Sequence, residues 1–302
     1  MAAPAAPGLF ETSLGHVAMA LVAVIAGVAM DVLAKVAAID APTAQLTLLR
    51  WLYGLLTLLP LMLVMKVRPG SPWRLIHLAR VGLNLIGSFC LYYSLGHLPL
   101  SLVVAVFFLE PLVAMALAAL FLRERMSRAC LLGLVIAVAG ILVMTGTADW
   151  RFDPLLGVPV LGALAWGTML VLTRSVGRHE PVLSLMFWLS IMTSLGMAPL
   201  ALPHWQPLTF QGHLAMFGVA FCGTFYGVLA ITVLRRAPVR IKASCSFLAL
   251  PLAFLAGFLF FGEQPPLRAI LGGVLVLAGV GLALDQRRAK PIVAEIRPEL
   301  AD

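Results

Sequence analysis

Apolar stretches of about 20 residues, separated by short polar breaks, recur along the whole chain of 302 residues. A helix of about 20 apolar residues crosses the hydrocarbon core of a bilayer, so each stretch is a candidate transmembrane helix. The chain is 62% hydrophobic and 11% charged, whereas soluble domains carry about 25% charged residues. We therefore predict an all-α, polytopic membrane protein. The ten predicted transmembrane helices are residues 14–38, 43–66, 75–96, 100–121, 128–146, 154–176, 182–202, 209–233, 241–261 and 266–285.

The second half of the chain repeats the first with a shift of 139 residues. The shift aligns Glu124 with Glu263, and Pro111 matches Pro251 with a slip of one residue. Because each copy has five spans, an odd number, we predict that the second copy lies inverted in the membrane, as in many secondary transporters. We expect Glu124 and Glu263 to anchor helix ends at opposite membrane faces. The predicted units are a first repeat (14–146), a second repeat (154–285) and a cytoplasmic tail (286–302).

The distribution of Lys and Arg residues predicts the orientation of the chain, because cytoplasmic loops carry an excess of both. With the N-terminus in the cytoplasm, 17 of the 21 Lys and Arg residues lie in inner loops or in the tail. The outer loops then hold only Arg151 and Arg268. We therefore expect both termini in the cytoplasm. The scattering of these residues between apolar spans also argues against a nucleic-acid-binding face.

Each copy ends in a motif with an aromatic residue, a glutamate and two glycines seven residues apart, and the sixth span holds a small-Trp-Gly sequence. With these motifs the chain resembles the drug/metabolite transporter superfamily (EamA-like carriers) over residues 14–285, and within it the bacterial exporters of aromatic amino acids. The resemblance implies a ten-helix carrier of the bacterial inner (plasma) membrane. It also implies export of aromatic amino acids and related small metabolites by alternating access through a central cavity. The motifs are Phe121-Leu122-Arg123-Glu124 with Gly133 and Gly140, Phe261-Gly262-Glu263 with Gly272 and Gly279, and Ala165-Trp166-Gly167.

Polar and aromatic side chains inside the spans are candidates for substrate binding. Asn84, Ser88 and Tyr92 recur every four residues, so they share one face of the third span. This stripe fits either a substrate path or interhelical hydrogen bonds, which Asn and Ser commonly form in membranes. Trp166 lies well inside the sixth span, away from the interfaces where Trp is enriched. Its indole fits either stacking against an aromatic substrate or plain packing.

Two prolines inside spans mark a second group of candidates. Each of Pro111 and Pro251 frees a backbone carbonyl one turn earlier, and such a kink can line a cavity or act as a hinge for gating. Ser244, Phe247 and Pro251 fall on one face of the ninth span. Phe108 and Pro111 occupy the matching places of the fourth span. We therefore include Phe108, Ser244 and Phe247 among the substrate-binding candidates.

Ionisable residues inside the spans are candidates for coupling or gating, because charge there is costly. Asp31 and Lys35 lie one turn apart with the acid first, so we expect them to form an ion pair. Arg50 can either attract a substrate carboxylate or extend along its apolar stem to the outer surface, and we expect the latter. Glu110, beside a proline in mid-span, is the candidate for proton coupling.

Two other functions fit the same composition. An exchanger of sugar-phosphates or nucleotide-sugars needs two or more basic residues inside the cavity. A membrane-embedded transferase needs clustered acids or a His–acid pair at one membrane face, and the sequence shows neither. Since the chain also lacks metal-binding, hydrolase and phosphate-loop motifs, we predict a transporter rather than an enzyme, with no cofactor and no metal. Its expected partners are a small-molecule substrate, the lipid bilayer and protons as coupling ion, with no nucleic acid.

Overall fold

The computed structural model describes residues 13–38, 41–69, 75–122, 128–145, 154–176, 181–236 and 245–284. Within these ranges every regular element is helical and no strand occurs, which confirms the predicted all-α class. The first half contains α1 (Ser13–Ala37), α2 (Thr43–Val64), α3 (Leu75–His97), α4 (Leu100–Phe107), α5 (Leu109–Leu122) and α6 (Arg128–Thr145). The second half contains η2 (Pro154–Leu156), α7 (Gly157–Val176), α8 (Val182–Ala201), η3 (Leu202–His204), α9 (Phe210–Arg236), α11 (Ala249–Phe261) and α12 (Leu267–Leu284).

Six of the described helices are long and apolar enough to cross a membrane: α1, α2, α3, α7, α8 and α9. The apolar segments Leu100–Ala114, Leu131–Met144, Ala249–Phe261 and Leu267–Leu282 are shorter. The outer faces of the helices are also apolar. On α9, for example, Phe210, Leu214 and Phe221 are all more than half exposed. Contiguous exposed apolar surface of this kind is what a lipid-facing helix requires.

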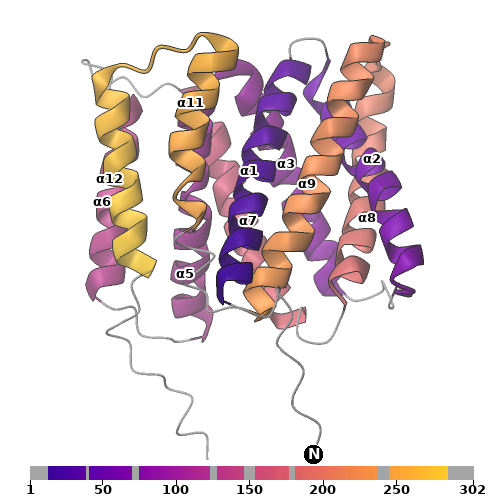
Figure 1. Ribbon diagram of the computed structural model, residues 1–302, viewed down its shortest axis with the longest axis horizontal. Helices are drawn as coiled ribbons and strands as arrows, with labels where there is room; N and C mark the ends of the chain where they lie inside the picture. The colour runs from indigo at the N-terminus through magenta and orange to yellow at the C-terminus, as the bar shows by residue number, and fades with distance from the viewer. Residues whose placement is uncertain are drawn as a thin grey trace, which may run out of the picture.

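The helices stand roughly side by side in a bundle, with α6 and α12 at one edge and α2 and α8 at the other (Figure 1). Between these edges, α1 packs along α9 and α3 packs along α7. The 139-residue shift carries α1 onto α7 and α3 onto α9. The two central helix pairs are therefore built from corresponding segments of the two halves.

Where α6 and α12 cross, glycines that correspond under the 139-residue shift make equivalent contacts. A Cβ atom on Gly140 would lie 2.7 Å from the carbonyl oxygen of Gly272, and one on Gly272 would lie 2.5 Å from that of Gly140. One on Gly279 would lie 2.6 Å from the carbonyl oxygen of Gly133. The shift maps Gly133 to Gly272 and Gly140 to Gly279, so the contact of Gly140 with Gly272 is the counterpart of the contact of Gly279 with Gly133. Only glycine allows two helices to approach this closely.

The helices that carry the two prolines are interrupted just before them. The predicted span 100–121 is divided at Phe108 into α4 and α5, three residues before Pro111. In the second half, Phe247 lies in a turn that precedes α11, four residues before Pro251. The rings of Phe108 and Phe247, which correspond under the shift, stack with centroids 6.4 Å apart and an interplanar angle of 20°. The expected proline effect therefore coincides with a local interruption of the regular helix in both halves, at which Phe108 and Leu248 keep right-handed helical backbone angles.

Candidate functional site

One face of α1 organises the candidate site. Gly27, Asp31 and Lys35 follow one another every four residues, so they lie one above the other, about 6 Å apart along the helix axis. Lys35 and Gly27 each contact residues of neighbouring helices, and Asp31 lies between them on this face. The site is therefore described as three successive layers, which begin at the end of α1 that carries Lys35.

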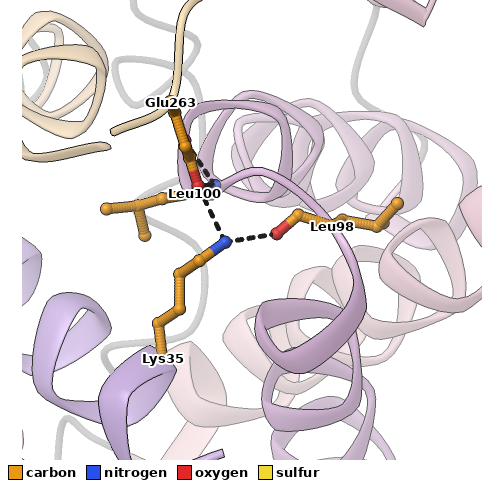
Figure 2. Close-up of polar contacts among 4 residues, drawn as sticks. All are labelled: Lys35, Leu98, Leu100 and Glu263. Carbon is orange, nitrogen blue, oxygen red and sulfur yellow. Dashed lines mark hydrogen bonds and ion pairs between the residues drawn. The ribbon is translucent and has the colours of Figure 1, made fainter. Parts of the chain in front are cut away.

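The first layer, which we call the closure, joins three segments at one end of the bundle (Figure 2). The Nζ atom of Lys35 lies 2.8 Å from Oε1 of Glu263 and donates a hydrogen bond to the carbonyl oxygen of Leu98 at 2.7 Å. The Glu263 carboxylate also accepts from the backbone N–H of Leu100 at 3.0 Å. The ring of Phe261 lies 5.2 Å from the same Nζ atom. The closure thus ties the end of α1 to the α3–α4 connection and to the α11–α12 connection.

This arrangement differs from the predicted pairing of Lys35 with Asp31. Although the two side chains are one turn apart, Lys35 forms its ion pair with Glu263, which comes from the other half of the chain. A partner that also accepts a backbone N–H holds the lysine in a fixed geometry, whereas a neighbour on the same helix gives only about 0.5 kcal/mol. The predicted role of Glu263 as an anchor for a helix end and loop agrees with its contacts.

The second layer centres on Arg50 of α2, which is 5% exposed and so does not reach the surface as predicted. A Cβ atom on Gly54 would lie 2.8 Å from its Nη1 atom, and one on Gly223 of α9 would overlap Nη2. These two glycines form a cradle for the guanidinium group. Its central carbon lies 4.8 Å from the centroid of Trp51, and the group also interacts with the hydroxyl of Tyr92 on α3. Nη1 has no hydrogen-bond partner in the described part of the chain.

The third layer consists of aromatic rings that lie over glycines. The indole of Trp166 on α7 fills the space beside Gly87 of α3 and lies 5.2 Å, centroid to centroid, from the ring of Phe107. Its Nε1 atom is buried and has no hydrogen-bond partner among the described residues. The ring of Tyr226 on α9 lies 3.4 Å from the Cβ position of Gly27. Rings with one free donor suit a planar ligand that carries a hydrogen-bond acceptor.

The shift of 139 residues explains the third layer. It maps Gly27 to Trp166 and Gly87 to Tyr226. Each of the two central crossings therefore holds one glycine and one aromatic ring. In the α3–α7 crossing the ring is on α7, and in the α1–α9 crossing it is on α9. Tyr226 is not among the site residues predicted from the sequence. The signal that could have identified it is the pairing of a glycine with an aromatic residue under the shift, Gly87 with Tyr226, as for Gly27 with Trp166.

Two acidic side chains face the layers from different helices. Asp31 lies within electrostatic range of both Tyr92 and Tyr226, and Glu110 of α5 lies within range of Tyr226. Neither group lies at a helix end that faces water. Asp31 and Glu110 therefore remain candidates for coupling, and both act electrostatically on Tyr226.

The polar stripe of α3 divides between two roles. Asn84 donates a hydrogen bond from Nδ2 to Oγ1 of Thr193 on α8 at 3.0 Å, and Ser88 accepts one from the indole of Trp51 on α2 at 3.2 Å. These two residues make the interhelical hydrogen bonds that were one of the two predicted alternatives. Tyr92, the third member, is the one that the structure places beside the Arg50 guanidinium.

The remaining candidates do not gather around these layers. Phe108 and Phe247 stack on each other at the helix breaks, where they belong to the apolar cluster beside α6 and α12. Pro111 is partly buried, and Pro251 is exposed on α11. Both remain hinge candidates because of the breaks beside them. Ser244 lies outside the described residues.

The sequence profile of the EamA-like transporter family matches the chain twice, over residues 13–146 and 155–284. Together these segments cover most of the chain, and the protein therefore belongs to the EamA-like transporter family. A crystal structure with 19% sequence identity superposes with a TM-score of 0.67 and covers 89% of this chain and 97% of its own. At that identity the likeness shows a shared fold alone.

Curated relatives carry the names of transporters for several small metabolites. The chain is 21% identical to the S-adenosylmethionine uptake transporter of Rickettsia prowazekii, over 88% of this chain and 91% of the relative. It is 28% identical to the riboflavin transporter of Rhizobium johnstonii, over 76% and 77% of the two chains. It is 24% identical to the pseudopaline exporter CntI of Pseudomonas aeruginosa, over 82% and 88%. These names confirm a transporter of small metabolites rather than an enzyme, and none of the three refers to aromatic amino acids.

Proposed function

We propose that the protein is a secondary transporter with ten transmembrane helices, arranged as two inverted repeats of five. The double match of one family profile, over residues 13–146 and 155–284, supports the duplication. The reciprocal glycine contacts of α6 and α12 support an approximate twofold axis, since contacts related by such an axis occur in equivalent pairs. Gly140 meets Gly272 and Gly133 meets Gly279, so α6 and α12 run antiparallel. Two equivalent helices related by a twofold axis in the membrane plane must run in this way.

The proposed mechanism is alternating access around the three layers. In the predicted orientation the closure of Lys35 and Glu263 lies at the outer face of a bacterial inner membrane, with both termini in the cytoplasm. An ion pair that also binds two backbone groups is a discrete element that is either formed or broken, which is what a gate requires. The helix breaks before Pro111 and Pro251 supply the flexible points, and protons bound at Asp31 or Glu110 are the proposed coupling ions.

The proposed substrate is a small metabolite with a planar ring, and aromatic amino acids are its simplest members. The single observation that carries this proposal is the buried indole of Trp166, whose N–H has no partner among the described residues and whose neighbours include the ring of Phe107 and Gly87. The named substrates of the relatives, such as S-adenosylmethionine and riboflavin, also contain ring systems. Export is the proposed direction, although the relatives include both an uptake transporter and an exporter.

Exchange of sugar-phosphates is the weaker alternative. A phosphate dianion is best bound by two or more cationic groups. Among the described residues, Lys35 forms an ion pair with Glu263. Arg80, which is buried like Arg50, donates a hydrogen bond to Thr173 at 3.0 Å. Of the two buried arginines in the described part of the chain, Arg50 alone has a guanidinium nitrogen without a partner, which fits one negative charge rather than two.

Transport into proteoliposomes tests the proposal directly. We expect wild-type protein to transport labelled L-tryptophan or S-adenosylmethionine. Trp166→Ala should reduce the initial rate about two- to tenfold, because an aromatic contact is worth about 0.5–1.5 kcal/mol beyond its buried area. The control is Trp205→Ala, since Trp205 lies 41% exposed in the connection before α9. A folded Trp166→Ala protein that transports at the wild-type rate would show that the indole only packs.

A further inference from the structure

The Arg50 guanidinium is a buried cation whose bonding capacity is incompletely used. Nη1 has no partner among the described residues, although the side chain is 5% exposed and lies about 10 Å from the start of α2. A buried charge without sufficient partners is costly in an apolar bundle. The cradle of Gly54 and Gly223 nevertheless holds the group in place. Such an arrangement fits a site whose remaining partner is a ligand.

A comparison of the two copies separates this group from the scaffold. The glycine contacts of α6 and α12 and the paired helix breaks occur in both copies, as expected for features that maintain the fold. The residues of the second layer occur in one copy only. Under the 139-residue shift, Arg50, Asp31 and Tyr92 correspond to Leu189, Leu170 and Ile231. None of these three residues is repeated at the matching place of the second copy, so the helices there form without them.

We propose that Arg50 binds the carboxylate of the transported metabolite, and that Asp31 faces the ammonium group of the same molecule. This assignment rests on the proposed transport function and narrows its substrate class to ring-bearing amino acids. Guanidinium and carboxylate groups form paired, charge-assisted hydrogen bonds. Tyr92, which already contacts the guanidinium, lies within electrostatic range of Asp31 and so connects the two groups.

The spacing of the layers agrees with such a ligand. Met30, the residue before Asp31, lies with the Arg50 guanidinium against Gly223, and Gly27 lies against the ring of Tyr226. Asp31 and Gly27 are one turn of α1 apart, or about 6 Å. This is similar to the separation of the carboxylate from the ring in an aromatic amino acid. The closure at Lys35 lies one further turn away, so it covers the charged layer from the outer side. A bound amino acid would then be shielded from water at its charged end.

Ligand pairs that differ only in the carboxylate test the proposal. Binding to the full-length protein in lipid nanodiscs would be measured for L-tryptophan against tryptamine, and for S-adenosylmethionine against its decarboxylated form. We expect the wild-type protein to prefer the carboxylate form of at least one pair by about 10- to 100-fold, as charge-assisted hydrogen bonds predict. Arg50→Gln should reduce this preference to about twofold or less. The matched control is Arg80→Gln, since Arg80 is also a buried arginine but has hydrogen-bond partners in the protein.

The outcomes separate this inference from the proposed function. If Arg50→Gln weakens the carboxylate form and leaves the decarboxylated form unchanged, the assignment of Arg50 stands. If a ligand pair binds but Arg50→Gln keeps the wild-type preference, the assignment is wrong while the transport function remains. If the folded wild-type protein binds no member of either pair, the proposed substrate class is wrong, and the assignment of Arg50 fails with it. Should Arg50→Gln not fold, Arg50→Lys keeps the charge without the paired geometry and should lose most of the preference.

Discussion

Breaking the ion pair between Lys35 and Glu263 should open the outer side of the transporter. Replacement of Lys35 by Met removes its 2.8 Å contact with Glu263 and its 2.7 Å bond to Leu98 but keeps the length of the side chain. Glu263 is then still satisfied by the N–H of Leu100. The variant therefore removes the closure without leaving a carboxylate that has no partner. Replacement of Glu263 by Gln removes the negative charge, so the amide oxygen can accept only a weaker hydrogen bond from Lys35, which keeps its bond to Leu98.

The size of the effect follows from the burial of the pair. The two side chains are 17% and 18% exposed, so the contact is largely shielded from water. A hydrogen bond to a charged group in such a place contributes about 1.5–3 kcal/mol. Because each 1.4 kcal/mol is a factor of ten, the ratio of closed to open protein should fall by about 10- to 150-fold. Removal of both partners should have the same effect as removal of one, since the pair is then already broken.

Thiol labelling from the outer side measures this ratio. Cys222 lies in α9, partly buried, next to the Gly223 that cradles Arg50. With Cys90, Cys130 and Cys245 replaced by Ala, a membrane-impermeant maleimide added to right-side-out vesicles should label Cys222 at least tenfold faster in Lys35→Met. Lys66→Met is the control, since Lys66 is exposed just beyond the end of α2. Labelling at the wild-type rate in both Lys35→Met and Glu263→Gln would refute the closure as a gate.

Two further predictions concern glycines. Gly140→Ala places a Cβ 2.6 Å from the backbone of α12 and should destabilise the protein by about 1–3 kcal/mol in thermal unfolding; Gly82→Ala on α3 has open space around it and should be neutral or slightly stabilising, so equal melting temperatures would contradict the close crossing. Gly87→Ala should displace the Trp166 indole and reduce transport, whereas Gly27→Ala meets its neighbouring ring at 3.4 Å and should retain it; equal rates for the two variants would contradict the assigned role of the indole.

The helical class and the extent of most helices could be predicted from the sequence because they depend on local properties. Runs of about 20 apolar residues and the punctuation between them are determined by burial in lipid and by turn chemistry. The division of one span at Phe108 was not anticipated as two separate helices, because a proline in a membrane helix is compatible with a kink as well as with a break. The choice depends on the packing around it, here the stacked ring of Phe247.

The partners of charged residues could not be predicted, because they depend on contacts between helices that are distant in sequence. The rule for pairs on one helix favoured Lys35 with Asp31, but the structure offers Lys35 a carboxylate 228 positions later in the sequence, with a backbone carbonyl beside it. The tendency of arginine to extend toward water likewise favoured an exposed Arg50. The two glycines that make its burial possible are on different helices, and only their contact with the guanidinium reveals the cradle.

The two halves of the protein make unequal contributions to the site, although they share one architecture. The two charged residues proposed to bind the substrate, Asp31 and Arg50, come from the first half. The rings of Trp166 and Tyr226, which lie over glycines, come from the second half. A duplicated fold in the membrane provides two similar helix crossings. If the two crossings were identical, a solute could bind between them equally well in two opposite orientations. Because charge and ring lie on opposite halves, a solute with one charged end and one planar end has a single favourable orientation. Motion of one half relative to the other would then act on both ends of the same molecule.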